Sequence, residues 1–422
     1  MTPPFGRGGE TASGLAPRLT WQLLALTIGP GLVVMLADTE AGSVIAAAQS
    51  GAEWGYRLVL PQFLLIPALF MAQELAARLG LATRQGLAEL VLQRSGRVAA
   101  TLLLAVLAAS CLGALVTELS GIAGVGERFG VPVWQSTALA AVGLLLVVWS
   151  GSYRSVEKVA ILVGLCELAF IALAWMAHPA PRELAAQLLD LPLGNRGYLY
   201  LLAANLGTCV IPWAVFYQQS ASIDKGLTAA NLAAMRVETL LGAILCQTVT
   251  AAVVVAAAAA LGHGRAAGLP LDRVGEIADA FSVAVGPAAG RLVFALGLSG
   301  GALVAAIVVS LTAAWAFGEA VGRPHALSER PREAPWFYGA FTVMVAGGAG
   351  LVASGANLVR LSVGAGVLNA VLLPIVLWFL DSMARQALPA ELRPRGLYAL
   401  ALRGVLALTG LAGLYAGVAG SL

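Results

Sequence analysis

Charged residues are scarce in this chain of 422 residues. Asp, Glu, Lys and Arg make up 11% of it, against roughly 25% in soluble domains. Histidine is rarer still and is confined to expected loops, at His178, His263 and His325. None of the four cysteines is placed to form a loop disulfide, and they lack the paired spacings of zinc and iron–sulfur sites. With no basic run and no nucleophile–base pattern, the sequence argues against a soluble domain, a nucleic-acid partner, a resident cofactor and an enzyme.

Long apolar segments are what the chain has in abundance, since hydrophobic residues make up 59% of it. A helix that crosses the hydrocarbon of a bilayer needs about 20 apolar residues. Eleven stretches of that kind occur, at about 21–50, 56–79, 98–125, 132–151, 156–178, 197–222, 233–262, 287–316, 336–353, 356–380 and 398–420. We therefore expect an all-α integral membrane protein that contacts the lipid bilayer. The stretches 178–197, 263–280, 323–335 and 381–397 would be inter-helix loops, with no soluble domain.

The positive charges predict an orientation. Cytoplasmic loops are enriched in Lys and Arg, and with the N-terminus inside, 17 of the 25 fall on the cytoplasmic side and 8 outside. The polar residues 1–20 lack the pattern of a cleavable signal, so we expect a cytoplasmic N-terminal tail. With eleven spans the C-terminus would lie outside, and a bacterial inner membrane is the expected location. The sequence leaves the oligomeric state open.

Two spans are interrupted by polar or helix-breaking residues at corresponding places. Residues 38–43 read Asp-Thr-Glu-Ala-Gly-Ser in the first span, and 207–213 read Gly-Thr-Cys-Val-Ile-Pro-Trp in the sixth. A break in a membrane helix is tolerated where it lines a cavity or binds a substrate. Inverted repeats, each with a broken first helix, are a recurring transporter plan. We therefore expect repeat one at 21–178, repeat two at 197–381, and a peripheral eleventh span at 398–420.

Further motifs resemble a known family. Gly-Pro-Gly at 29–31, Gln-Ser-Gly-Ala-Glu-Trp-Gly-Tyr at 49–56 and Ala-Arg-Leu-Gly-Leu-Ala-Thr at 77–83 look like the Nramp divalent-metal transporters. The similarity runs from about residue 28 through span ten and implies a LeuT-like inverted repeat. The family's signature is Asp-Pro-Gly-Asn in the first break and Met-Pro-His in the sixth. Here these become Glu-Ala-Gly-Ser at 40–43 and Ile-Pro-Trp at 211–213.

The departures from the signature predict a change of ion. In the family the Asp, the Asn, the Met sulfur and a backbone carbonyl three residues before the Met bind the metal. The resemblance gives those positions to four residues here: Glu40, Ser43, Ile211 and Thr208. Ile211 has no lone pair, and a site of oxygen ligands suits Mg²⁺, Ca²⁺ and Mn²⁺. Mg²⁺ usually keeps several waters and needs one or two carboxylates. The pattern is most similar to the Nramp-related magnesium transporters, with Ile211 and Trp213 setting specificity.

Each candidate ligand also has a structural explanation. Glu40 either binds the ion or caps free N–H groups at the break, and an intramembrane carboxylate favours binding. Asp38 binds the ion directly, attracts cations, or pairs with a buried cation. Ser43 and Thr208 either bind the ion or satisfy local backbone groups, as hydroxyls in membrane helices often do.

Further amides lie where the cavity is expected. Asn205, one turn before the sixth-span break, and Gln218 and Gln219 after it either reach the water shell of the ion or form interhelical hydrogen bonds. Asn369 in span ten has the same two interpretations, at a place where the family has polar residues near the metal.

A proton pathway is present only in part. Glu118 in span three resembles the family's proton-pathway glutamate, but the companion acid position holds Leu115. Proton-coupled members look to use sixth-span histidines, and those positions hold Trp213 and Gln218, which cannot titrate near neutral pH. We therefore expect no tight proton coupling; Glu118 or Asp38 acting alone is the alternative. Two more intramembrane acids are expected to be partners of arginines or of backbone groups: Glu74 and Glu167.

The sequence thus predicts a secondary transporter or facilitator of hard divalent cations, Mg²⁺ first and Mn²⁺ second. It would move a partly hydrated ion at the midplane by alternating access. One alternative is a proton-coupled Mn²⁺/Fe²⁺ symporter of the Nramp type. A more remote one is an organic-solute carrier on a LeuT-like scaffold, which would need an exposed helix N-terminus for a carboxylate, whereas an acid occupies the first break. A single sequence does not exclude a channel.

Overall fold

Every regular element of the described residues is a helix. The structure is a computed structural model, and it describes residues 29–149, 153–261, 271, 274–321, 329, 331–354 and 357–421. Within these residues, nine helical stretches are long and apolar enough to cross a membrane. The first half contains α2 Pro30–Asp38, α3 Ala41–Trp54, η1 Gly55–Leu58, α4 Val59–Thr83, α5 Leu87–Arg128, α6 Val133–Trp149, α7 Tyr153–Gly164, η2 Leu165–Leu168, α8 Ala169–Met176 and α9 Pro181–Gln187. The second half contains α10 Arg196–Cys209, α11 Pro212–Asp224, η3 Ala229–Asn231, α12 Leu232–Leu261, α13 Val274–Val285, α14 Pro287–Val321, α15 Pro335–Ala353, α16 Leu358–Ala387 and α17 Gly396–Ser421.

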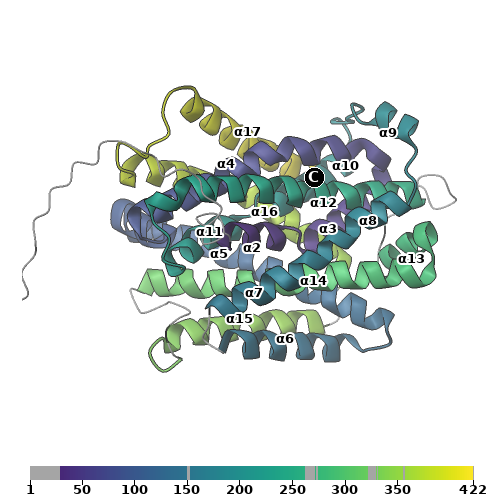
Figure 1. Cartoon of the computed structure of the whole chain (residues 1–422), viewed down its shortest axis with the longest axis horizontal. Helices are drawn as coiled ribbons and strands as arrows, with labels where there is room; N and C mark the ends of the chain where they lie inside the picture. The colour runs from purple at the N-terminus through teal and green to yellow at the C-terminus, as the bar shows by residue number, and fades with distance from the viewer. Residues whose placement is uncertain are drawn as a thin grey trace, which may run out of the picture.

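The two broken spans lie in the middle of the bundle. Figure 1 shows α2 and α3 between the long helices α12 and α14, and both helices pack against them. Helices α6 and α15 pair at one edge, while α17 lies at the opposite edge against α16. Nearly every residue of α2, α3, α10 and α11 is buried. The outer helices therefore shield the broken spans from lipid. Irregular backbone is tolerated at membrane depth when it is buried in protein in this way.

Both expected breaks are confirmed. Helix α2 ends at Asp38, the Thr39 N–H turns back to the Leu36 carbonyl at 3.2 Å, and Glu40 is extended before α3 begins. In the sixth span α10 ends at Cys209, and the extended Ile211 precedes Pro212, the first residue of α11. Proline suits this position because the first turn of a helix leaves its N–H groups without intrahelical partners.

Helices lie in all eleven expected spans, but Ala41–Thr83 joins parts of the first two in one stretch and α6 is shorter than a full span. Two corrections apply. Short helices α9 and α13 lie where loops were expected, at 178–197 and at the end of 263–280. Helix α5 begins at Leu87, before the expected start at 98, and Gly96 joins its two parts with a φ of 85° that favours glycine. Charged residues at 89, 94 and 97 hide this first part from a hydropathy scan. The expected tail 1–20, the start of span one, His263 and His325 lie outside the described residues.

Candidate functional site

The two helix breaks face one another. A Cβ placed on Gly42 would lie 3.0 Å from Glu40 Oε1 and 3.6 Å from the Thr208 methyl carbon, so the start of α3 and the end of α10 are in contact. The side chains of Glu40, Ser43 and Thr208 are all buried. The structure therefore brings together three of the four residues that the family resemblance indicated.

A second carboxyl group lies beside Glu40. The carboxyl group of Glu118 lies beside that of Glu40, and Glu118 Oε2 accepts a hydrogen bond from the Ala41 N–H at 3.0 Å. Glu40 Oε2 and Glu118 Oε1 are buried and have no hydrogen-bond partner within the described residues. Two carboxylates in contact repel unless a proton or cation lies between them. This pair is thus a place where positive charge is stabilised.

The hydroxyl groups of Ser43 and Thr208, at the two breaks, donate their protons to nearby backbone carbonyls. Ser43 Oγ donates to the Glu40 carbonyl at 2.9 Å, and Thr208 Oγ1 donates to the Asn205 carbonyl at 3.3 Å. Each hydroxyl has a single proton and two lone pairs. Each hydroxyl oxygen can therefore donate to the backbone and still bind an ion through a lone pair.

Asn205 ties three helices together. Its Nδ2 donates to Ser50 Oγ and to the Leu201 carbonyl, both at 2.7 Å, and its Oδ1 accepts from Gln62 Nε2 at 2.7 Å. Both polar atoms of the amide therefore have hydrogen-bond partners, which lie on α3, on α4 and on α10 itself. This geometry favours the interhelical role that the sequence left open, and contact between Asn205 and the ion's water shell stays a prediction.

The two glutamines after the sixth-span break point to different neighbours. Gln218 Nε2 contacts Met235 Sδ at 3.1 Å, and Gln219 Nε2 donates to the Gln85 carbonyl at 2.7 Å. The Oε1 atom of each is buried, with no partner in the part of the chain that the structure describes. Each glutamine therefore keeps one unused acceptor, and Gln219 is anchored to the loop between α4 and α5.

The expected specificity residues are completely buried at the start of α11. Ile211 and Trp213 both show 0% exposure. Helix α16 runs against the end of α10, because a Cβ on Gly207 would collide with Ala370, the neighbour of Asn369. Trp213 Nε1 and Asn369 Oδ1 are buried without a partner among the described residues. That Ile211 stands at the position of the family's sulfur ligand stays a prediction.

One of the two expected structural acids is confirmed and the other is not. Glu74 Oε1 pairs with Arg78 Nη2 at 2.5 Å and Arg236 Nε at 2.7 Å. The expectation for Glu167 is wrong, since neither of its carboxyl oxygens has a hydrogen-bond partner within the described residues. The same is true of both Asp38 oxygens. Neither acid takes part in an ion pair formed by these residues, so no basic side chain in the described part of the chain neutralises Asp38.

One end of the first span is held by an acid that the sequence did not single out. Glu238 Oε1 on α12 accepts hydrogen bonds from the backbone N–H groups of Gly29 at 2.7 Å and Leu32 at 2.8 Å. The Lys225–Glu157 ion pair, 2.7 Å long, fills the space where Gly29 would carry a side chain. The signal for Glu238 was present, because acids within membrane spans are functional candidates by default.

The other end of the first span is held by an amide. Gln49 Nε2 donates to the Leu271 carbonyl at 2.5 Å, and the Leu271 N–H donates to Gln49 Oε1 at 3.3 Å. With Asp38, Glu40 and Ser43 each no more than 2% exposed, the site between these two anchors is closed to solvent on both sides.

A family model described as "Natural resistance-associated macrophage protein-like" matches residues 31–419. The chain belongs to the Nramp family. Two curated relatives are "Divalent metal cation transporter MntH" of Verminephrobacter eiseniae, 28% identical over 256 residues, and "Metal transporter Nramp3.2" of Populus trichocarpa, 30% identical over 239 residues. The matched regions cover 56% and 52% of this chain and 56% and 46% of the relatives, so the chain spans about half the length of each. These names describe transport rather than catalysis.

Solved structures agree with this assignment at the level of fold. A manganese transporter of Eremococcus coleocola superposes with a TM-score of 0.73 at 17% identity, covering 98% of this Nramp chain and 90% of that one. MhsT in complex with L-phenylalanine superposes with a TM-score of 0.58 at 15% identity, over 92% and 98%. The expected LeuT-like inverted repeat with broken first and sixth spans is thereby confirmed.

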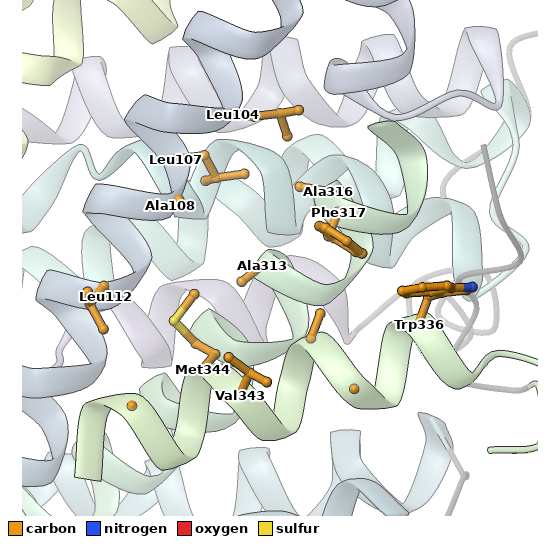
Figure 2. A pocket seen from close by; sticks show the side chains of 13 residues that line it. Leu104, Leu107, Ala108, Leu112, Ala313, Ala316, Phe317, Trp336, Val343 and Met344 are labelled. Carbon is orange, nitrogen blue, oxygen red and sulfur yellow. The ribbon is translucent and has the colours of Figure 1, made fainter. Parts of the chain in front are cut away.

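A large cavity elsewhere in this Nramp chain is apolar. It measures about 750 Å³ and lies between α5, α14 and α15 (Figure 2). The labelled side chains around it are Leu104, Leu107, Ala108, Leu112, Ala313, Ala316, Phe317, Trp336, Val343 and Met344. A lining of this kind has no group that replaces the water around an ion. The cavity is therefore not a candidate for the cation site.

Proposed function

We propose that this Nramp chain is a carrier or facilitator of hard divalent cations, with Mg²⁺ first and Mn²⁺ second. The observation that carries the proposal is the donor set at the two facing breaks. Glu40 contributes carboxylate oxygens, Ser43 and Thr208 contribute hydroxyl and carbonyl oxygens, and Ile211 contributes nothing. Oxygen ligands favour Mg²⁺ and Mn²⁺, whereas a thioether favours softer ions. Mg²⁺ would keep several of its waters here, and contact of those waters with Asn369 and Gln218, each of which has a buried oxygen without a partner among the described residues, is part of the proposal.

The transport cycle follows from the closed site. An ion bound at Glu40 exchanges with either solution only when one anchor of the first span opens, which is alternating access. The proposal includes an N-terminus in the cytoplasm of a bacterial cell, as the distribution of Lys and Arg predicts. A membrane potential of 100 mV, negative inside, supplies about 4.6 kcal/mol for two charges. Entry of a dication therefore needs no proton gradient.

A proton-coupled Mn²⁺/Fe²⁺ symporter is the second candidate. It is favoured by the contact between Glu118 and Glu40, because a proton on Glu118 and a cation bound at Glu40 would repel each other directly. An organic-solute carrier is disfavoured, since Glu118 already accepts from the Ala41 N–H at the start of α3. A substrate carboxylate would need that helix N-terminus.

Uptake into proteoliposomes tests the proposal. Purified protein is reconstituted, and Mg²⁺, Mn²⁺, Ca²⁺ and Cd²⁺ are supplied in parallel at matched membrane potential, with protein-free vesicles as the control. We expect saturable entry of Mg²⁺ and Mn²⁺ and poor entry of Ca²⁺. Strong Cd²⁺ uptake without Mg²⁺ flux would reject the oxygen-only site.

A further inference from the structure

The apolar cavity between α5, α14 and α15 has an exposed rim. Four large apolar side chains that line it are between 36% and 73% exposed: Leu112, Phe317, Trp336 and Val343. All four stand on helices that are long and apolar enough to cross a membrane. Exposed apolar side chains on such helices face the hydrocarbon of the bilayer. The cavity is therefore a groove that opens sideways toward lipid.

Glycine on α15 keeps this groove hollow. A Cβ placed on Gly339 or on Gly347, which both line it, would meet no atom within 4 Å. The next residue shows the contrast, because a Cβ on Gly348 would lie 2.9 Å from the Leu115 side chain. Protein interiors are close-packed and leave few voids larger than a water molecule. A groove of about 750 Å³ is thus space that the chain itself does not fill.

The length of the groove matches one leaflet of a bilayer. Its lining residues on α15 run from Trp336 to Gly347, and eleven residues of α-helix rise by about 16 Å. The hydrocarbon core of a bilayer is about 30 Å thick, so one leaflet contributes about 15 Å. An acyl chain of a phospholipid in one leaflet therefore fits along the groove.

One end of the groove lies at the membrane surface. Because Leu115 is beside Gly348 and Leu104 shares the groove with Trp336, α5 and α15 run in the same direction. Figure 2 shows the Trp336 ring at one end of the groove, with its nitrogen turned away from the other labelled side chains. Tryptophan is enriched where hydrocarbon meets water. The start of α15 therefore marks the level of the lipid headgroups.

Two arginines lie just beyond this end. Arg97 begins the second part of α5, after Gly96, and Arg332 lies three residues before the start of α15. Both are exposed, and neither takes part in an ion pair formed by the described residues. With one acid nearby, Glu333, this end keeps a net positive charge. Arginine binds phosphate through a planar fork of N–H groups, so the charges suit an anionic headgroup.

We propose that the groove binds one acyl chain of an anionic phospholipid, with the lipid phosphate at Arg97 and Arg332. The tail would run past Trp336 toward Gly347. In the proposed orientation this lipid belongs to the cytoplasmic leaflet, where anionic lipids attract basic residues next to a span. The lipid would lie against α5, the helix that carries Glu118. The inference goes beyond divalent transport, because lipid binding is measured without any ion.

The test counts lipids on the purified full-length protein. Delipidated protein in detergent is mixed with phosphatidylglycerol or with phosphatidylcholine of identical acyl chains, and native mass spectrometry measures the adducts. We expect one tightly held phosphatidylglycerol per chain, roughly fivefold favoured over phosphatidylcholine for each arginine that contacts it. A ligand that binds only the folded state also raises the Tm in a saturable way. Equal binding of the two lipids would overturn the assignment of an anionic headgroup.

Matched variants locate the lipid. Gly347→Leu fills the groove without a clash and should remove the tight adduct, whereas Gly350→Leu should keep it. Gly350 also has open space around its Cβ, on the same helix but outside the lining. Unchanged lipid binding in Gly347→Leu would overturn the inference. A dimer of the delipidated protein that Gly347→Leu dissociates would also overturn it, in favour of a second copy of the chain.

Charge variants test the headgroup. The double variant Arg97→Gln with Arg332→Gln should weaken phosphatidylglycerol binding by roughly tenfold or more, while phosphatidylcholine binding stays the same. Arg182→Gln removes an exposed arginine of α9 and should change neither. Equal phosphatidylglycerol binding in the double variant and in Arg182→Gln would contradict the placement of the phosphate. Failure of Mg²⁺ uptake would leave these lipid measurements unaffected, so the two proposals fail separately.

Discussion

Glu118 Oε2 accepts a hydrogen bond from the backbone nitrogen of Ala41 at 3.0 Å. The third span thereby caps the second half of the first span and holds its own carboxyl group against Glu40. Both acids are anchored on the same helix start. A change in charge at the proposed ion site therefore acts directly on the carboxyl group of Glu118, which lies on the neighbouring helix α5.

The Glu40 carboxylate is expected to be essential for transport. Glu40→Gln keeps the size of the side chain but removes the countercharge that a dication needs inside a membrane, so uptake into proteoliposomes should fall to that of empty vesicles. Glu40→Asp should retain activity with a changed affinity. Size-exclusion profiles check that both variants fold. Normal Mg²⁺ uptake by the Gln variant would move the anchor to Asp38 or Glu118.

Ile211→Met should restore a soft ligand to the sixth-span break. The exchange nearly conserves volume, which buried sites tolerate well. A thioether favours softer transition metals, so we expect affinity for Cd²⁺ or Mn²⁺ to rise roughly tenfold in binding measured by calorimetry. Ile211→Leu supplies the same bulk without sulfur and serves as the control. Equal affinities in the two variants would contradict the placement of Ile211 at the site.

Asn205 is expected to act through structure rather than through the ion. Asn205→Ala leaves Gln62 and Ser50 without their partner, and a lost buried hydrogen bond of this kind costs about 1–3 kcal/mol. The Tm in detergent should therefore drop, while the ion concentration for half-maximal uptake stays the same. A large rise in that concentration at unchanged Tm would show that Asn205 reaches the ion's water shell.

Glu238 is expected to hold the first half of the first span in place. Glu238→Ala leaves two buried N–H groups at Gly29 and Leu32 without an acceptor, so the Tm should fall by more than in Glu238→Gln, whose amide oxygen still accepts. The exposed Glu391→Gln serves as the reference. Equal Tm values for the Ala and Gln variants would mean that these hydrogen bonds do not stabilise the fold.

Transport is expected to proceed without tight proton coupling. Trp213 and Gln218 stand where the family's proton-coupled members look to have histidines, and neither titrates near neutral pH. A pH-sensitive dye trapped in proteoliposomes should therefore report no acidification as Mg²⁺ or Mn²⁺ enters. Metal-dependent acidification that is absent from empty vesicles would favour the symporter, and Glu118 would be the first residue to change.

The spans and breaks were predictable from local sequence. Apolar length determines where a chain crosses a bilayer, and Pro212 and the polar run after Asp38 mark the breaks directly. The short helices α9 and α13 were not predictable in this way, because they are too short to carry a membrane-spanning signal. The first part of α5 was missed since its charged residues mimic a loop.

The environment of each acid was harder to predict. Glu74 and Glu167 are both acids in apolar spans, but only Glu74 has an arginine one helical turn further along its own helix, Arg78. The rest of the difference depends on which other spans pass nearby: α12 brings Arg236 to Glu74, whereas η2 turns Glu167 toward Gly301 and the Thr39 carbonyl. Contacts between spans far apart in the chain decide the role of a buried charge, and one sequence does not contain them.

Helix α12 supplies the anchor for one end of the first span through Glu238, and Leu271, ten residues beyond its last residue, supplies the other through Gln49. A straight helix of 30 residues is about 45 Å long, so α12 acts as a lever that runs past the whole of α2 and α3. A tilt of this lever that lengthens the hydrogen bonds at one end changes the angle at the other. Because α12 packs against both α2 and α3, a tilt that lengthens the hydrogen bonds from Glu238 would shift the contacts of both halves of the first span at once.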